Sequence, residues 1–117
     1  MIDRKTFEEN FRGIDAAVII SIINIFEEEF PQRFKEIHRN ILEEDFAKLA
    51  FNAHSLKGVV STFWAEVPAR LAKELEIMAR DEQPQGMIPL FEELKSASEI
   101  LLGELKIIRE ELSQNEI

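Results

Sequence analysis

Residues 46–63, FAKLAFNAHSLKGVVSTF, carry the pattern that decides the fold. Apolar residues recur there at alternating steps of three and four, which is typical of a helix that buries one stripe in a bundle. These residues are Phe46, Leu49, Ala53, Leu56, Val60 and Phe63. At about 100° per residue, His54 lies about 120° from the centre of the stripe. We therefore predict a long bundle helix that presents His54 to water.

Small side chains share the outward quarter of this helix with His54, where most surface helices carry long charged residues. They are Ala47, Ala50, Gly58 and Ser61. A histidine among small residues can be reached by something large, so we expect a partner protein to dock here. The predicted partner contacts are Ala47, Ala50, Phe51 and Ser61. Glycine inside a helix costs about 1 kcal/mol relative to alanine, so either partner access or a close helix crossing should explain Gly58.

The N-terminal third of the chain predicts helices with clear start and stop signals. A short helix is expected at residues 4–11 and ends before Gly13. Asp15 can cap the next helix, which runs to about Phe30. Its strongly apolar part, residues 16–26, is too short to cross a bilayer. We expect that part to cover one end or side of a bundle, or to serve as a dimer contact.

The middle of the chain predicts two helices around an acidic break. Pro31 suits the first turn of a new helix, which should end at about Glu43. Asp45 can cap the helix that carries His54 and that continues to about Trp64.

The last third predicts two more helices, separated by a loop at residues 81–87 (DEQPQGM). Pro68 is tolerable in the first turn of the earlier helix, whose inner face carries Leu71, Leu75 and Met78. Ser98 interrupts the apolar stripe of the last helix, which consists of Phe91, Leu94, Leu101, Leu105, Ile108 and Leu112.

Long helices joined by short loops favour antiparallel neighbours. No segment alternates with period two, so no strand is predicted. We expect an all-α fold in which residues 1–117 form one domain. Its architecture should be an up-down-up-down antiparallel four-helix bundle with additional N-terminal helices, in a chain that is a monomer.

Bulk composition narrows the classes of partner and cofactor. The 117 residues carry a formal net charge of −9, which repels phosphate backbones and anionic lipid, so nucleic acid and membranes are poor partners. The chain has no cysteine, which excludes thiolate metal sites and is compatible with a reducing cytoplasm. We expect no secretory signal at the N-terminus. The Glu-x-x-His spacing of di-metal bundles is absent before His54 and His38, so we expect no metal, and His38 should be a solvated side chain.

The segment Ala53-His54-Ser55-Leu56-Lys57-Gly58 resembles the signature of histidine phosphotransfer (HPt) domains, the intermediate carriers of phosphorelays. The resemblance extends to the Phe-Pro pair at 30–31, the acidic break at 43–45, and the spacing of residues 65–76. It implies that His54 accepts a phosphoryl group, that Lys57 neutralises its oxygens, and that Gly58 leaves room for a receiver domain.

The sequence departs from the family pattern at two positions. Trp64 stands where many members have glycine, ten residues after the histidine. Pro68 stands where an aliphatic residue is more usual. Both lie at the junction after the histidine helix.

The chemistry that the resemblance implies is compatible with the residues. A solvent-facing imidazole is mostly the free base at neutral pH and can act as a nucleophile. Phosphoryl transfer requires mainly positioning and charge neutralisation, and Mg²⁺ is expected in the partner receiver domain rather than as a cofactor of this chain. The sequence has no glycine-rich loop or P-loop, so we expect no ATP site. The predicted partners are receiver domains of response regulators or hybrid histidine kinases. A helical interaction module of the same fold that is not phosphorylated is the alternative.

Overall fold

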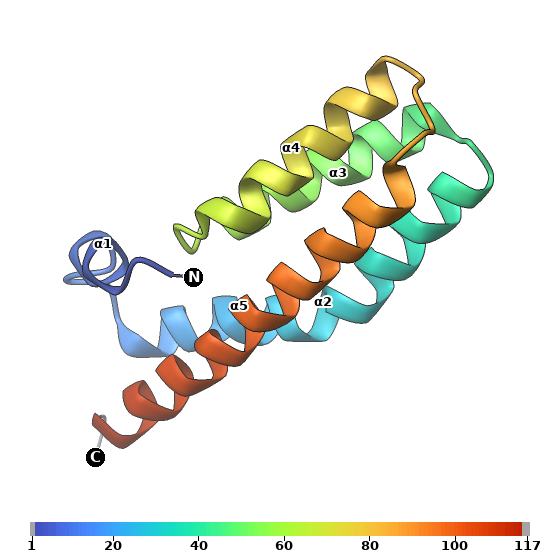
Figure 1. Cartoon of the computed structure of the whole chain (residues 1–117). Coiled ribbons are helices and arrows are strands. Elements are labelled where there is room, and N and C mark those ends of the chain that lie inside the picture. The colour runs from blue at the N-terminus through green and yellow to red at the C-terminus, as the bar shows by residue number, and fades with distance from the viewer. Residues whose placement is uncertain (1, 116–117) are drawn as a thin grey trace.

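The computed structural model describes residues 2–115 of the chain, which form five helices joined by short connections (Figure 1). The helices are α1 (Arg4–Asn10), α2 (Ala16–Leu42), α3 (Phe46–Ser61), α4 (Glu66–Arg80) and α5 (Met87–Asn115). No strand occurs in this described part. The predicted all-helical fold is confirmed, and α2 to α5 form its antiparallel four-helix bundle.

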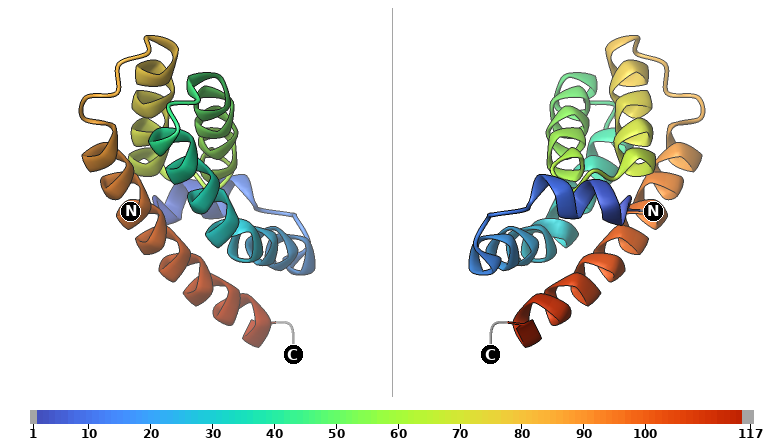
Figure 2. Two further views of the ribbon diagram at one scale, coloured as in Figure 1. Left: turned by 90° about the vertical axis from the view of Figure 1, so that its right-hand side faces the viewer. Right: turned by 90° about the vertical axis from the view of Figure 1, so that its left-hand side faces the viewer.

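The four bundle helices differ in length, and this difference sets the shape. α2 and α5 have 27 and 29 residues, whereas α3 and α4 have 16 and 15. At 1.5 Å per residue, the longer pair spans roughly 40 Å and the shorter pair roughly 24 Å. The N-terminal half of α2 and the C-terminal half of α5 therefore project beyond α3 and α4. Figure 2 shows α1 lying across the ends of α3 and α4 at this projecting part.

Only one additional N-terminal helix is present in the described chain, although the sequence predicted more than one. Asp3 caps α1 by accepting a hydrogen bond from the backbone N–H of Thr6. Phe7 and Phe11 are buried, and the Phe11 ring packs edge-on against Trp64, with the ring centroids 5.5 Å apart. The segment 16–26, which was expected to be a second such helix, is the N-terminal half of α2 instead.

The predicted helix break at Pro31 is wrong, because α2 continues through it. Proline lacks an N–H and therefore leaves the carbonyl of Glu27 without its helical donor. The apolar stripe nevertheless continues on both sides, with Phe30 and Phe34 both buried and their ring centroids 4.7 Å apart. This burial keeps the segment helical. Figure 1 shows that α2 changes direction near its middle, as expected for a proline kink.

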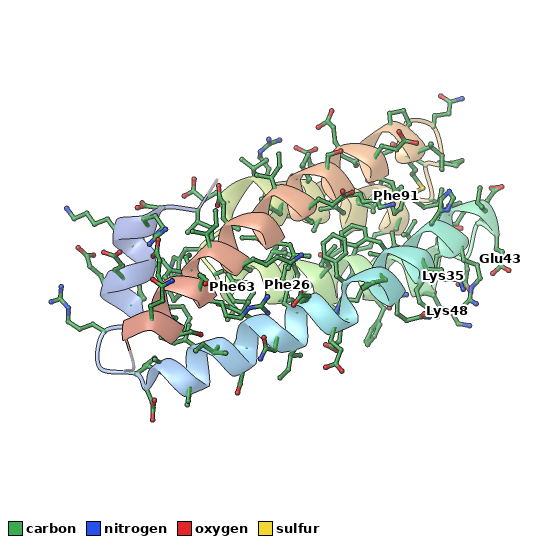
Figure 3. All side chains as sticks on the ribbon, turned by 90° about the horizontal axis from the view of Figure 1, so that it is seen from below. Phe26, Lys35, Glu43, Lys48, Phe63 and Phe91 are labelled. Carbon is green, nitrogen blue, oxygen red and sulfur yellow. The ribbon has the colours of Figure 1, made fainter. Side chains whose placement is uncertain are left out.

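The predicted caps of α2 and α3 are confirmed. The side chain of Asp15 accepts a hydrogen bond from the backbone N–H of Ala17, and that of Asp45 accepts one from Lys48. Phenylalanine rings link α2 to α3 in the core. Figure 3 shows Phe26 and Phe63 next to each other there, and their ring centroids lie 5.5 Å apart. These anchors fix α3 against α2 with one face turned outward.

Trp64 occupies the turn between α3 and α4 in a conformation that normally suits glycine. Its φ is 55°, in the left-handed region. The backbone N–H of Ala65 bonds to the carbonyl of Val60, which is the six-to-one bond of a helix C-terminus closed by a left-handed residue. Glycine is the residue that this turn favours, and Trp64 adopts the conformation at a cost in strain.

Candidate functional site

His54 projects from the outward face of α3, as predicted. Leu49, Ala53, Leu56 and Val60 are fully buried on the opposite side of the helix. The side chain of His54 is 61% exposed. The helix stripe that packs into the core therefore holds the imidazole at the surface, in a fixed position along α3.

The Nδ1 atom of His54 contacts a buried carboxylate on α4. It lies 3.1 Å from Oε1 and 3.2 Å from Oε2 of Glu76, whose side chain is 10% exposed. An ionised carboxylate can only accept hydrogen bonds, so the shared hydrogen belongs to Nδ1. The other ring nitrogen, Nε2, then has a free lone pair and no proton. Glu76 thus selects the tautomer in which Nε2 carries the free lone pair.

Two cations hold the Glu76 carboxylate. Nε and Nη2 of Arg80 donate to Oε2 over 3.0 and 2.8 Å, and Nζ of Lys57 lies 3.7 Å from Oε1. Burial raises the pKa of Glu76. The hydrogen bonds from Arg80 and His54, together with the positive charge of Lys57, outweigh burial and hold that pKa below its usual value. The carboxylate is therefore ionised at neutral pH, and the charged side chains around His54 leave one net positive charge.

Gly58 lies one turn after His54, on the exposed side of α3. A Cβ atom built on Gly58 would have no neighbouring atom within 4 Å. The glycine therefore does not mark a close helix crossing, which was the second explanation that the sequence left open. The space above it is free for a partner.

The predicted partner-contact residues are not all on the open face. Ala47, Phe51 and Ser61 are exposed, and Phe51 reaches 74%. Ala50 is only 6% exposed, so its predicted outward position is wrong. It lies on the side of α3 that faces α4, where Ala50 and Ala79 line a hollow of about 640 Å³.

A second, partly exposed apolar surface lies between α2 and the C-terminal part of α3. We call it the Ile25 patch, and it consists of Val18, Ile22, Ile25 and Val59. Val18 and Ile25 are 49% and 54% exposed, and the other two residues line a shallow hollow of about 170 Å³ with Ile25. His54, Gly58 and Thr62 follow one another at steps of four residues, and Thr62 borders the same hollow. The patch therefore begins about one to two helical turns beyond His54 along α3.

Sequence reasoning missed two residues of the site, Glu76 and Arg80. Glu76 lies 22 positions after His54, and contact between them depends on how α3 packs on α4. One signal was present in the sequence. Glu76 follows Leu75 of the inner stripe and precedes Arg80 by four residues, a spacing that brings a carboxylate and a guanidinium together.

His38, the other histidine, has a different environment. Its ring stacks on Phe91 at a centroid distance of 5.1 Å, and Lys35 and Lys95 line the same groove between α2 and α5. Within residues 2–115, no group of three or more His, Asp or Glu side chains is placed to hold a metal ion. None of the described helices has the length and apolar character that crossing a membrane requires.

The model of the Hpt domain family matches residues 21–114, which is most of the chain and includes α3, α4 and nearly all of α5. The chain belongs to the Hpt domain family. The four-helix bundle and His54 on the open face of α3 fit this Hpt assignment, and α1 lies outside the matched part. Neither a curated protein nor a solved structure matches the chain.

Proposed function

We propose that this Hpt domain is a phosphorelay intermediate. It accepts a phosphoryl group on His54 from the aspartyl-phosphate of one receiver domain and passes it to an aspartate of another. The observation that carries the proposal is the contact between Nδ1 of His54 and the buried Glu76, because this contact leaves Nε2 of a 61% exposed ring as the nucleophile.

The positive charges beside His54 suit a phosphoryl group. Lys57 and Arg80 are both close enough to contact Glu76, and Arg80 is 62% exposed. An arriving phosphoryl group carries negative charge on its oxygens, which these cations stabilise in the transition state and in the product. Mg²⁺ would come with the receiver domain, and this chain would not use ATP itself.

The surface around His54 suits a large phosphodonor. Gly58 leaves open space next to the imidazole, and the Ile25 patch offers apolar area farther along α3, towards α2. Exposed apolar side chains such as Ile25 and Val18 could pack against a protein partner. In this proposal a receiver domain covers Gly58 and the Ile25 patch while its aspartyl-phosphate reaches Nε2.

The reaction would take place in the cytoplasm, with the chain acting as a monomer. The partners would be receiver domains of response regulators or hybrid histidine kinases. The absence of cysteine is compatible with a reducing compartment. Sedimentation equilibrium would test the monomer, and a concentration-dependent mass would contradict it.

A transfer assay with two histidine variants tests the proposal. The chain is incubated with a phosphorylated receiver and Mg²⁺, and acid-labile, base-stable phosphate on the chain is measured. We expect wild type and His38→Gln to be labelled and His54→Gln to remain unlabelled with an unchanged circular dichroism melting curve. Equal labelling of the two variants would overturn the assignment of His54.

The alternative function is a docking module of the same fold that is never phosphorylated. The exposed Phe51 and the Ile25 patch would serve such a module equally well. It would bind a receiver domain with the same affinity in wild type and His54→Gln, and it would take up no phosphate. Transfer to wild type separates the two functions.

A further inference from the structure

The side chain that contacts the imidazole is a carboxylate, and it is buried. Glutamine in place of Glu76 could also accept a hydrogen bond from Nδ1–H, so orientation of the ring alone does not require a charge. A buried carboxylate is costly unless it is paired. Arg80 and Lys57 pair with the Glu76 carboxylate, and its Oε1 atom still lies 3.1 Å from Nδ1 of His54. The negative charge of Glu76 next to Nδ1 of His54 must therefore do more than orient the ring.

We infer that the Glu76 carboxylate keeps the phosphorylated ring of His54 protonated at Nδ1, so that the domain passes phosphate on quickly rather than storing it. This inference rests on the proposed function, in which His54 is the phosphoacceptor. It concerns the lifetime of the phosphorylated form, which the proposed function leaves open.

The bonds that form and break during the transfer show why the Nδ1 proton matters. In the first step the Nε2 lone pair forms a bond to phosphorus. The bond from phosphorus to the donor aspartate breaks, and its electron pair goes to the aspartate oxygen. The ring still carries its Nδ1 proton and is now a cation. The adjacent carboxylate stabilises that cation, because opposite charges within about 4–6 Å favour the charged form.

The second step reverses these changes on another aspartate. A carboxylate oxygen of the acceptor attacks phosphorus, and the electron pair of the N–P bond returns to Nε2. With Nδ1 protonated, the leaving group is a neutral imidazole. Without that proton it would be an imidazolate anion, which is a much poorer leaving group. No proton has to move in either direction while Glu76 holds the Nδ1–H.

The charged groups around Glu76 maintain this arrangement. Those that face it are His54 and Lys57 from α3 and Arg80 from its own helix α4. The two hydrogen bonds from Arg80 both go to Oε2, so Oε1 is left to His54 and Lys57. Arg80 is in this sense a positioning residue that acts through Glu76.

The test compares Glu76→Gln with wild type after loading both with phosphoramidate, a small donor that needs no docking surface. Gln keeps the size and the acceptor oxygen and removes only the charge. Glu74→Gln is the matched control, because Glu74 lies on the same helix and pairs with the exposed Arg70 instead. ¹⁵N NMR of the phosphorylated ring between pH 5 and 10 reports the pH at which Nδ1 loses its proton. Transfer to a receiver is timed over the same range.

We expect Glu76→Gln to lose the Nδ1 proton about one to three pH units below wild type, the usual effect of one close opposite charge. Above that pH its phosphorylated form should last longer and transfer more slowly, whereas Glu74→Gln should match wild type. Deprotonation at the same pH in wild type and Glu76→Gln would overturn the inference. So would an equal shift in Glu74→Gln, or failure of phosphoramidate to label His54. A chain that phosphoramidate labels at His54 but no receiver does would overturn the proposed function alone.

Discussion

Replacing Gly58 with alanine should stabilise the domain, and the size of the effect follows from the structure. Gly58 is an interior residue of α3, and an added Cβ would have no neighbour within 4 Å. The substitution therefore costs no packing and gains the helix propensity of alanine, about 1 kcal/mol. For 117 residues, an unfolding entropy of about 2.1 cal/mol/K per residue converts this gain to a rise of about 4 °C in Tm.

Glutamine at the same position separates stability from access. Gly58→Gln should also fold at least as well as wild type, because glutamine has a much higher helix propensity than glycine. Its long side chain would stand one turn from His54 on the open face of α3. Thermal unfolding by circular dichroism gives the stability, while labelling is compared between a phosphorylated receiver and phosphoramidate. We expect a clear loss with the receiver and none with phosphoramidate. A fall in stability of several kcal/mol, or unchanged transfer from the receiver, would refute the reasoning about access.

The remaining predictions concern the charges at the site and the strained turn. Lys57→Ala should slow transfer a few-fold in rapid-quench assays, since a partly exposed charge contributes up to about 1 kcal/mol. Lys57→Arg should restore only part of the rate, and a wild-type rate in Lys57→Ala would contradict the role. Folding holds the pKa of Glu76 below its usual 4.5, so its contribution to stability is complete above that pH and is lost as the pH falls through the lowered value. The difference in unfolding free energy between wild type and Glu76→Gln should therefore shrink below pH 4.5, and a difference independent of pH would contradict this. Phe11→Ala and Trp64→Gly should show a coupling energy of about 0.5–1.5 kcal/mol in a double-mutant cycle by urea unfolding, because each removes one ring of the same pair. Additive effects would show that α1 does not support Trp64.

The periodicity of apolar residues was sufficient to predict the bundle and the exposure of His54. It was not sufficient at Pro31. Proline tends to end a helix, but burial of Phe30 and Phe34 on either side favours a continuous one. Burial dominates there, so α2 continues as a kinked helix. The angular position of Ala50 around the helix also led to a wrong prediction. That angle does not show how far the neighbouring helix α4 covers the surface of α3, and Ala50 is buried.

The candidate site was predictable only on the helix that carries it. His54, Lys57 and Gly58 lie within five residues and share a face by spacing alone. Glu76 and Arg80 join them through the packing of α4 against α3, which a single helix pattern does not specify. The left-handed turn at Trp64 could not be predicted from local sequence preferences, because a bulky residue disfavours that conformation. The contact between the Trp64 and Phe11 rings supports it.

In the proposed relay, phosphate from a receiver domain arrives on Nε2 of His54. The most direct measurement is NMR of the ¹⁵N-histidine-labelled chain after reaction with a phosphorylated receiver and Mg²⁺, followed by addition of a second receiver. We predict a phosphorus coupling on Nε2 of His54 that disappears as the second receiver becomes phosphorylated. Phosphate on Nδ1, on His38, or nowhere on the chain would contradict it.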